Sequence, residues 1–462
     1  MDIKNIFPQN KLYFIGIGGV SMSGLCEILL ANGGYSISGS DNIETNITRF
    51  LQKEGILVHI GQNSKNIKDD IELVVYTAAI KEDNPELQEA KKLGITTLER
   101  SVFLGKLMKA YKKPLCIAGT HGKTTTTSMV SEVFMHAQKD PTISVGGILS
   151  SINSNFKIGT DEYFILETCE YCDTFLEFDP HSAIILNIDE DHMDYFKDLN
   201  HIYNSFQKFA SYTKEDACIV INADIKDYKK ITQNLKSKLI TYGKNVESDW
   251  KAHNIQFDEF GCGSYDAYFK DKLMYNIKLN VVGEHNIYNS LAVCALANFY
   301  DLSKSHIQQG LLNFKGTSRR FEYKGEFNNI KVIDDYAHHP VEVKATLDAT
   351  KTQKFNKLWC VFQPHTYTRT KAFLEEFAEA LNYADNILIS DIYSAREIDK
   401  GEVHSKDLVN SINNINNKKA TYIKDFQEGV EYLKSNCEQG DMIITMGAGD
   451  IFKLGEMLLT DI

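Results

Sequence analysis

One segment, residues 115–124, constrains the fold of this chain more than any other. The apolar run Leu115–Ala118 leads directly into the loop GTHGKT (119–124), and a helical pattern follows the loop. Apolar runs without polar alternation are typical of strands that are buried on both faces, as in parallel sheets covered by helices. Glycines let a loop turn tightly so that its N–H groups converge, and the amino end of the next helix adds partial positive charge. The segment therefore predicts an α/β domain whose strand ends in a phosphate-binding loop.

Lys123 and Thr124 give this loop its expected chemistry. In loops of this kind the lysine reaches the β- and γ-phosphates of a nucleotide, and the hydroxyl binds Mg²⁺. The common pattern has a glycine five residues before the Gly-Lys pair, but Ile117 stands there, so the loop is shorter than usual. Because strand, loop and helix coincide, we favour a nucleotide site over a plain glycine turn.

The strand–turn–helix rhythm recurs in three blocks along the 462 residues, a length typical of roughly three domains. The apolar runs at 12–15, 115–118 and 330–333 belong to successive blocks, and the polar segment 245–278 predicts hairpins or loops. We expect domain boundaries near residues 108 and 323. The predicted fold class is therefore α/β with three domains, at 1–107, 108–322 and 323–462.

The charge balance and the cysteine pattern limit the class of protein. Lys plus Arg is 50 and Asp plus Glu is 62, a net charge of −12, which argues against nucleic acid or a membrane surface as partner. No apolar stretch approaches the ~18 residues of a membrane span, and the amino terminus lacks an apolar signal core. Cys169 and Cys172 have CxxC spacing, but no second such pair completes a zinc site. We expect a soluble, reduced, cytoplasmic protein without membrane insertion.

A second glycine loop, GIGGVSMSG (16–24), follows the first apolar run. It is similar to a dinucleotide fingerprint, although Ser21 replaces the third glycine. Asp41 lies 20 residues beyond Ser21, where a ribose-binding acid is expected. On its own the loop leaves NAD and another nucleotide diphosphate equally open, and a tight packing turn without a ligand is the third alternative. Two phosphate loops in one chain predict two phosphorylated ligands.

Several polar residues follow apolar runs, where strand ends of an α/β sheet face the ligand crevice. Glu167 ends the run 163–166 and can receive Mg²⁺ from the side of Thr124; Glu170 is a weaker candidate. His192 lies in the segment after the run 183–186, where an imidazole could bind a second cation or orient a substrate.

Asn286 and Asn289 share one face of a predicted helix and could bind an adenine edge or a ribose. Arg320 lies near the second boundary, where an arginine can clamp a γ-phosphate. The histidine-bearing segments 334–340 and 363–369 both follow strands. They lack the HxH or HExxH spacing of metal sites, so we favour hydrogen-bonding roles.

The order of these motifs resembles that of the Mur ligases. The match extends from Gly16 to Asp450, and ordered motifs over such a length are far more specific than any one loop. The motifs are GIGGVSMSG (16–24), SGSD (38–41), GTHGKTTT (119–126), NIDEDHMDY (187–195), EHNIYN (284–289), GTSRRFE (316–322), DDYAHHP (334–340), QPHTYTRT (363–370) and MGAGD (446–450).

The resemblance implies a Rossmann-like N-terminal domain for a UDP-linked sugar, a central P-loop-type ATPase domain and a Rossmann-like C-terminal domain for an amino acid. It implies an ATP-dependent ligase of peptidoglycan precursor synthesis, with Mg²⁺ as cofactor, that joins L-alanine to the lactyl carboxylate of UDP-N-acetylmuramate. ADP and phosphate would leave after an acyl phosphate forms.

The resemblance also assigns roles to residues of this sequence. The catalytic residues implied are Lys123, Glu167, His192 and Arg320. Two Mg²⁺ ions would be held by Thr124, Glu167 and His192. The ATP contacts implied are Gly119, Thr120, His121, Gly122, Lys123, Thr124, Thr125, Asn286, Asn289, Arg320 and Asp335. The UDP-sugar contacts implied are Gly16, Gly18, Gly19, Ser21, Met22, Ser23, Ser40 and Asp41. The amino-acid contacts implied are Tyr336, His338, His365 and Arg369.

The sequence departs from the family pattern in three places. The usual EADES reads ETCEY at 167–171, so both acids remain in changed surroundings. Thr366 replaces an arginine that some members carry, which weakens a second-cation assignment. Gln207 occupies the position of a carbamylated lysine in other members, with Lys208 one residue away, so we assign no such modification.

The sequence alone leaves three alternative functions open. An NAD-dependent dehydrogenase would use the loop at 16–24 but leaves the GTHGKT loop unexplained. A related ligase that joins a tripeptide to the same sugar fits the 16–24 segment less well. A non-enzymatic, ATP-gated binding module predicts slow ATP turnover that sugar and amino acid do not change.

Overall fold

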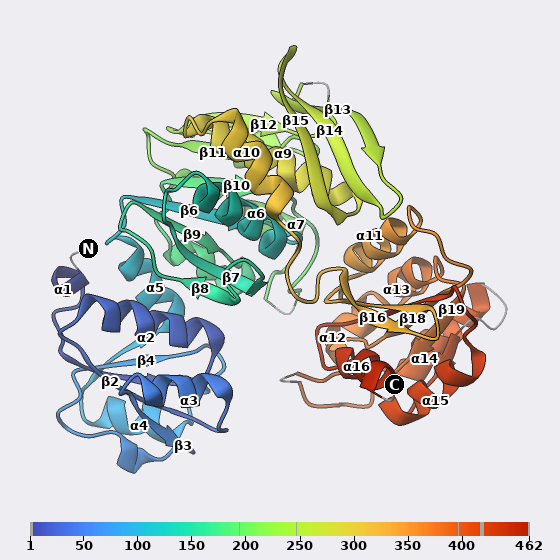
Figure 1. Ribbon diagram of the computed structural model, residues 1–462. Coiled ribbons are helices and arrows are strands. Elements are labelled where there is room, and N and C mark those ends of the chain that lie inside the picture. The colour runs from blue at the N-terminus through green and yellow to red at the C-terminus, as the bar shows by residue number, and fades with distance from the viewer. Residues whose placement is uncertain (1–2, 194, 246, 396, 416–419, 461–462) are drawn as a thin grey trace. The chain divides into compact units, whose positions relative to one another are not determined.

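The computed structural model describes residues 3–193, 195–245, 247–395, 397–415 and 420–460 (Figure 1). The described chain forms two compact units, residues 1–251 with 292–310, and residues 252–291 with 311–462. Its strands form α/β sheets in the three predicted blocks, so the predicted fold class is confirmed. In the described part of the chain, no helix combines the length and the apolar character that a membrane span requires.

The first sheet lies within the first unit and all its strands are parallel. Its order is β3 (Leu57–Ile60), β2 (Ser36–Asp41), β1 (Lys11–Ile15), β4 (Leu73–Tyr76) and β5 (Thr96–Glu99). Its helical elements are α1 (Ile3–Ile6), α2 (Val20–Asn32), α3 (Asn46–Lys53), η1 (Ser64–Asn66), α4 (Pro85–Lys92) and α5 (Arg100–Met108).

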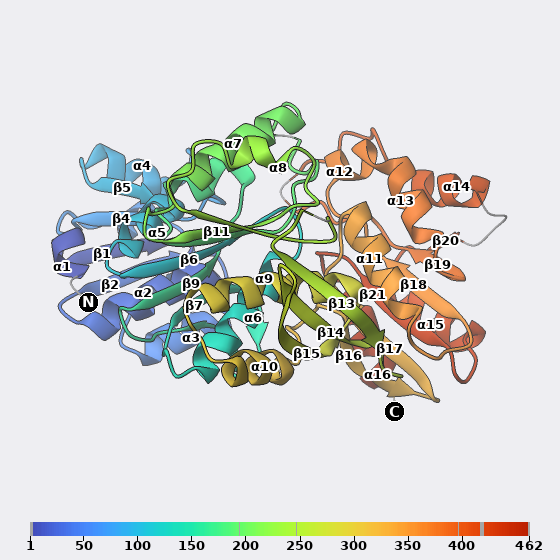
Figure 2. The same ribbon diagram turned by 90° about the horizontal axis from the view of Figure 1, so that it is seen from above.

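Successive side chains of β1 point to opposite faces of this sheet, and helices cover both faces. Leu12 and Phe14 join the core that includes side chains of α2, α3 and α5, whereas Tyr13 and Ile15 pack with Leu87 of α4. Figure 2 shows α2 and α4 on opposite sides of these strands. The chain order reverses at β1, so the loop after β1 lies at the switch point where α/β sheets bind ligands.

The second sheet has the order β12 (Lys238–Tyr242), β11 (Cys218–Asn222), β10 (Ser182–Ile185), β6 (Lys113–Ala118), β9 (Tyr163–Glu167), β7 (Thr142–Leu149) and β8 (Ser154–Lys157) in the first unit. Only β8 is antiparallel to its neighbour among these described strands. The helical elements along this block are α6 (Lys123–His136), η2 (Tyr171–Glu177), α7 (Leu199–Ser211), α8 (Tyr228–Ile231), α9 (Glu284–Phe299) and α10 (Lys304–Asn313).

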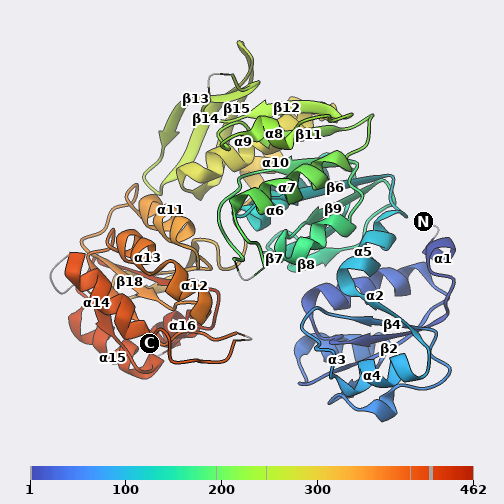
Figure 3. The same cartoon turned by 180° about the vertical axis from the view of Figure 1, so that it is seen from behind.

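Strand β6 lies between β9 and β10, at the switch point of this sheet. Helix α6 packs on one face, where Phe134 contacts Tyr163 with ring centroids 5.1 Å apart. Helix α7 packs on the other face, where Phe206 and Phe209 join Ala118 in the core. Figure 1 shows the α6 side and Figure 3 the α7 side.

In the second unit, β14 (Cys262–Phe269) and β15 (Lys272–Val282) form the antiparallel hairpin predicted for the polar segment, preceded by β13 (Trp250–Phe257). The third sheet has the order β16 (Glu322–Phe327), β17 (Ile330–Asp335), β21 (Met442–Met446), β18 (Leu358–Phe362), β19 (Asn386–Ile389) and β20 (Ala420–Tyr422). Its helices are α11 (Pro340–Thr350), α12 (Tyr367–Ala372), α13 (Leu374–Leu381), α14 (Ser405–Ile415), α15 (Phe426–Asn436) and α16 (Phe452–Thr460).

Two cores hold this third sheet between helix layers. Cys360 and Phe362 of β18 face the core built with α11, α13 and α14, and Val361 faces the core built with α15 and α16. Figure 2 shows these two helix groups on opposite sides of the strands. The segments 334–340 and 363–369 therefore leave the carboxyl ends of β17 and β18, as expected.

Candidate active site

The phosphate loop of the central block follows β6 and is held by the segment after β10. Gly119 has φ 140° and Gly122 has φ 80°, both in the region that favours glycine. A Cβ on Gly119 would lie 3.0 Å from the Cβ of Leu186, so the close approach to β10 also requires glycine. Asn187 accepts from the N–H of His121 at 2.7 Å and donates back to its carbonyl at 3.0 Å. The loop is therefore preorganised by its neighbour.

Lys123 begins α6 and its amine lies inside the loop. Nζ donates to the carbonyls of Gly119 at 2.5 Å and Thr120 at 3.0 Å, and pairs with Glu170 Oε2 at 3.1 Å. Burial, the largest single influence, lowers the pKa of Lys123, but the negative groups around the amine, Glu170 foremost and Glu167 among them, together outweigh burial and raise the pKa. The amine therefore stays charged, and the loop carbonyls of Gly119 and Thr120 hold it in place.

Thr124 and Glu167 form a pair of oxygen ligands beside the loop. Thr124 Oγ1 donates to Glu167 Oε2 at 2.9 Å, and the N–H of Gly146 donates to the same oxygen at 2.9 Å. A hydroxyl and a carboxylate are the hard ligands that Mg²⁺ prefers, and Mg²⁺ usually takes few protein ligands besides phosphate oxygens and water. Among the described residues no cluster of three or more His, Cys, Asp or Glu side chains could hold an ion. The pair fits an ion that arrives with a nucleotide.

Glu170 links the loop to His192. Its side chain is only 3% exposed, and Oε1 lies 3.9 Å from His192 Nε2. His192 has φ 56°, unusual for a residue other than glycine, and its ring packs against Tyr171 with centroids 4.6 Å apart. The structure thus brings Lys123, Thr124, Glu167, Glu170 and His192 around one loop. Asp194, in the same predicted motif as His192, lies outside the described residues.

The N-terminal glycine loop packs against the end of β2. The N–H groups of Gly16 and Ile17 donate to the Ser40 carbonyl at 2.8 and 2.9 Å, and that of Gly18 donates to Asp41 Oδ2 at 2.9 Å. Asp41, predicted as a ribose-binding acid, is the last residue of β2 and contacts the glycine loop itself.

The predicted side chains of this loop differ in their exposure. Ser21 accepts a hydrogen bond from Arg100 at 3.2 Å. Met22 and Ser23 are buried, and the fully buried Ser40 hydroxyl donates to Glu86. Gly16, Gly18 and Gly19 therefore have only backbone atoms to offer a ligand, whereas the buried Met22 and Ser40 side chains support the loop by packing and hydrogen bonding.

Two asparagines of the second unit are joined to each other. Asn286 Nδ2 donates to the Val282 carbonyl at 2.8 Å, and Asn289 Nδ2 donates to Asn286 Oδ1 at 3.0 Å. Both side chains are largely buried. They share one face of α9, as their spacing predicts.

Asp335 ends β17 and accepts two backbone hydrogen bonds. Oδ1 accepts from Ala337 at 2.8 Å and Oδ2 from Phe321 at 2.7 Å. Burial raises the pKa of Asp335 from 3.8 to about 6, although the charge of Arg320 opposes the rise. The Arg320 guanidinium lies 5.1 Å from the Tyr336 ring centroid. Arg320, Asp335 and Tyr336 therefore lie close together in the second unit.

The amino-acid residues implied by the resemblance also gather in the second unit. The His338 ring lies 5.5 Å from that of Tyr336 and 5.7 Å from that of His365, measured between centroids. Arg369 donates from a terminal guanidinium nitrogen to His365 Nδ1 at 3.2 Å. They form a polar cluster at the carboxyl ends of β17 and β18.

Sequence reasoning missed three charged residues that support these groups. Arg319 pairs with Asp334 at 3.0 Å and donates to the carbonyls of Gly449 and Gly447 at 3.0 and 2.6 Å. Glu342 contacts His338, and Glu397 accepts from the first N–H groups of α12. The adjacent arginines and the MGAGD motif were the available signal for Arg319. Glu342 and Glu397 carried no such signal.

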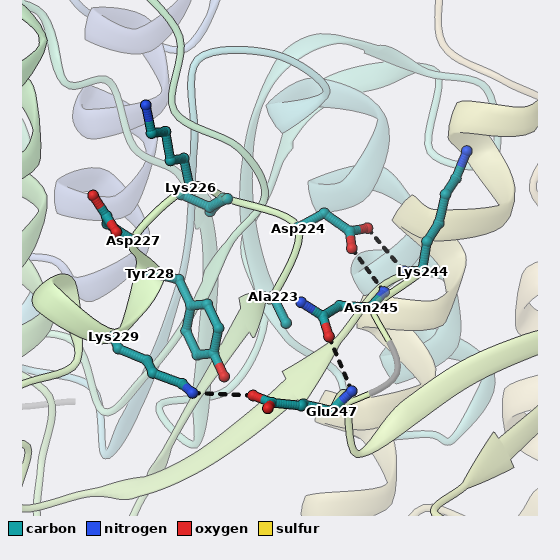
Figure 4. Close-up of a pocket in the computed structure, with 10 residues that line it drawn as sticks. Ala223, Asp224, Lys226, Asp227, Tyr228, Lys229, Lys244, Asn245 and Glu247 are labelled. Atoms are coloured by element: carbon teal, nitrogen blue, oxygen red, sulfur yellow. Dashed lines mark hydrogen bonds and ion pairs between the residues drawn. The ribbon is translucent and has the colours of Figure 1, made fainter.

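A surface hollow of the first unit lies at α8, and its lining residues include none of the predicted site residues (Figure 4). Asp224 accepts from the N–H groups of Lys244 and Asn245, both at 2.8 Å, and Lys229 pairs with Glu247 at 3.0 Å. These contacts engage Asp224, Lys229 and Glu247 within the protein, and we assign the hollow no ligand.

Comparison with known proteins identifies the family. The family model described as Mur ligase family, catalytic domain, matches residues 11–112. That described as Mur ligase middle domain matches residues 117–297. That described as Mur ligase, glutamate ligase domain, matches residues 319–449.

Individual relatives match this chain along almost its whole length. A UDP-N-acetylmuramate–L-alanine ligase of Acetivibrio thermocellus is 49% identical, covering 100% of this chain and 98% of the relative. One of Clostridium perfringens is 47% identical, with 98% of each chain covered. The crystal structure of UDP-N-acetylmuramate-alanine ligase from Thermotoga maritima superposes with a TM-score of 0.82 at 28% identity, covering 98% of each chain. A murein peptide ligase from Psychrobacter arcticus shares the fold, with a TM-score of 0.70 at 24% identity and 98% of each chain covered. This chain belongs to the Mur ligase family.

Proposed function

We propose that this protein joins L-alanine to the lactyl carboxylate of UDP-N-acetylmuramate while it converts ATP to ADP and phosphate. The observation that carries the proposal is the full-length match, at 49% identity, to a relative named for this reaction. The Lys123 loop, with Thr124 and Glu167 beside it, supplies the chemistry that the reaction requires. The reaction belongs to peptidoglycan precursor synthesis, which we place in the cytoplasm.

Each block of the chain takes one substrate in this proposal. Residues 1–107 bind the UDP part of the sugar at the loop after β1. Residues 108–322 bind ATP at the loop after β6, and residues 323–462 bind the amino acid. The support is that the first two sheets present their predicted loops at a switch point, and that the third presents its predicted motifs at the carboxyl ends of β17 and β18, on either side of β21.

The carboxylate of the sugar is a poor acyl donor because its oxygen is not a leaving group. Transfer of the γ-phosphoryl group of ATP turns that oxygen into part of a phosphate, which can leave. Lys123 stabilises the charge that develops on the transferring group. Mg²⁺, when bound, neutralises charge on the phosphate oxygens. Thr124 and Glu167 would hold one ion, and His192 would contribute to a second.

The remaining predicted ATP residues come from the second unit. Asn286 and Asn289 would bind the adenine side, because amides both donate and accept hydrogen bonds. Arg320 would approach the γ-phosphate, and Asp335 would fix the chain beside it through its backbone hydrogen bonds. The guanidinium of Arg369 suits the alanine carboxylate, since a planar fork of donors binds carboxylates well.

Release of phosphate with single substrates omitted tests the proposed function. With ATP, UDP-N-acetylmuramate and L-alanine together we expect steady phosphate release and a product heavier than the sugar by one alanine residue. Omission of the sugar or of ATP should abolish release, and omission of L-alanine should reduce it to a slow background. Replacement of L-alanine by the tripeptide used by murein peptide ligases should give no faster release than that background. Turnover that sugar and amino acid do not change would contradict a ligase.

A further inference from the structure

Arg100 places a positive charge beside the glycine loop of the first sheet. Across the adjacent parallel strands β1, β4 and β5, Ile15 is in register with Tyr76, and Tyr76 with Glu99. The glycine loop begins directly after Ile15, and Arg100 directly follows Glu99, so both leave the same carboxyl edge of the sheet. At that edge Nη1 of Arg100 donates to Ser21 Oγ at 3.2 Å, which joins the start of α5 to the loop.

Arg100 is half-buried and has no acidic partner in the part of the chain that the structure describes. Its guanidinium forms no ion pair there, and its one side-chain hydrogen bond is to the neutral hydroxyl of Ser21. The adjacent Glu99 carboxylate turns to the start of α5 instead, where it accepts from the N–H of Ser101 at 3.2 Å and from the Ser101 hydroxyl. Because a cation held partly out of water favours an anionic partner, the position of Arg100 points to a negatively charged ligand.

The glycine loop itself brings little positive charge to a phosphate group. The N–H groups of Gly16 and Ile17 donate to the Ser40 carbonyl, and that of Gly18 donates to the Asp41 carboxylate. Asp41 adds a negative charge beside the loop, and the whole chain has a net charge of −12. Since a diphosphate is itself negatively charged, a cation from outside the loop is needed to hold it here.

We propose that Arg100 binds the diphosphate of the UDP-linked sugar, and that the hydrogen bond to Ser21 holds its guanidinium at the loop before the substrate arrives. The inference rests on the proposed function, which supplies the substrate. An arginine suits this role because its planar fork of donors binds two phosphate oxygens at once. Arg100 would thus be a substrate-binding residue that no motif of the sequence indicated.

The same substrate carries a second anion, the lactyl carboxylate. In the proposed function that carboxylate must reach the γ-phosphate of ATP at the loop after β6. Arg100 lies instead at the loop after β1, through its contact with Ser21. We therefore assign Arg100 to the diphosphate, and the experiment below distinguishes the two anions.

Binding of three ligands to the full-length protein tests this assignment. The ligands are UDP-N-acetylmuramate, UDP-N-acetylglucosamine, which has the same diphosphate but no lactyl carboxylate, and uridine, which has neither anion. Each is titrated into the unaltered protein and into Arg100→Gln, which removes the charge and still suits the first turn of a helix. We expect the Kd of both nucleotide sugars to rise about tenfold to a hundredfold, as loss of a hydrogen-bonded charge does, and the Kd of uridine to stay within about twofold.

Two further variants show whether the charge at this position is what matters. Lys106→Gln is the matched control, because it removes an exposed positive charge from the same helix, and each Kd should stay within about twofold. Arg100→Lys keeps the charge but not the fork of donors, so it should lose less affinity for the nucleotide sugars than Arg100→Gln. Added salt should weaken the binding of UDP-N-acetylmuramate to the unaltered protein more than to Arg100→Gln. In turnover, Arg100→Gln should raise the KM for UDP-N-acetylmuramate and leave the KM for ATP and for L-alanine unchanged.

Equal affinity of Arg100→Gln and the unaltered protein for both nucleotide sugars, or an equal loss in Lys106→Gln, would overturn the inference while leaving the proposed function intact. A loss confined to UDP-N-acetylmuramate would assign Arg100 to the lactyl carboxylate and would also overturn it. If the unaltered protein bound neither nucleotide sugar, the proposed function would fail, and the inference with it.

Discussion

Replacement of Lys123 by alanine is expected to lower kcat by about a thousandfold in a protein that still folds, with a lower Tm because the buried Glu170 loses its partner. The Lys123 amine is placed by Gly119, Thr120 and Glu170 inside the phosphate loop. Loss of one preorganised group that stabilises transition-state charge costs about 3–4 kcal/mol. Initial rates of phosphate release at saturating substrates measure the effect.

Lys139 provides the control for this substitution. It is an exposed lysine just beyond the carboxyl end of α6, whereas Lys123 is at the amino end. Lys139→Ala therefore removes the same charge beside the same helix without changing the loop. Its kcat should match that of the unaltered enzyme. A folded Lys123→Ala variant with near-normal turnover would show that the loop does not hold the transferring phosphate.

The second large effect is expected for Glu167→Gln. Glutamine keeps the size of the side chain and an acceptor for Thr124 and Gly146, but it removes the negative charge that an Mg²⁺ ligand provides. Since a bound metal contributes several kcal/mol to charge stabilisation, kcat should fall by about a hundredfold. Activity should recover in part as the Mg²⁺ concentration is raised.

Glu170→Gln is the comparison that distinguishes the two acids. Glu170 is buried and paired with Lys123, and removing one partner of a buried ion pair costs about 3–5 kcal/mol. We therefore expect Glu170→Gln to lower Tm by several degrees, and Glu167→Gln to change Tm much less. If Glu170→Gln leaves Tm unchanged, lowers kcat more than Glu167→Gln and responds to Mg²⁺, the metal role belongs to Glu170.

The buried strands could be predicted from the sequence because they are unbroken apolar runs. β1, β6 and β18 lie at the centre of their sheets, covered by helices on both faces, so nearly every side chain must be apolar. Edge strands gave no such signal. β5 (Thr96–Glu99) is only half buried and has a largely polar sequence, and the three-residue β20 is as short as a turn.

The candidate site residues that lie at the carboxyl ends of strands could be predicted from the sequence. Lys123, Thr124 and Glu167 come directly after β6 or at the end of β9, and a parallel sheet brings these ends together. Supporting residues were harder to predict. Glu342 contacts His338 only four residues away, but no motif marked it. Arg319 lies in a motif, yet its contacts are with carbonyls about 130 residues further along the chain, which a pattern of neighbouring residues does not reveal.

Transfer of oxygen from the sugar carboxylate to phosphate tests the central claim most directly. In the proposed function Lys123, Thr124 and Glu167 act at the β- and γ-phosphates, and we predict no cation at the α-phosphate, where adenylation would need one. UDP-N-acetylmuramate labelled with ¹⁸O in both lactyl carboxylate oxygens is incubated with ATP, L-alanine and Mg²⁺, and the products are analysed by mass spectrometry. We predict ADP, phosphate that carries one ¹⁸O, and an alanine amide that retains the other. Label in AMP, or unlabelled phosphate beside labelled amide, would contradict an acyl phosphate.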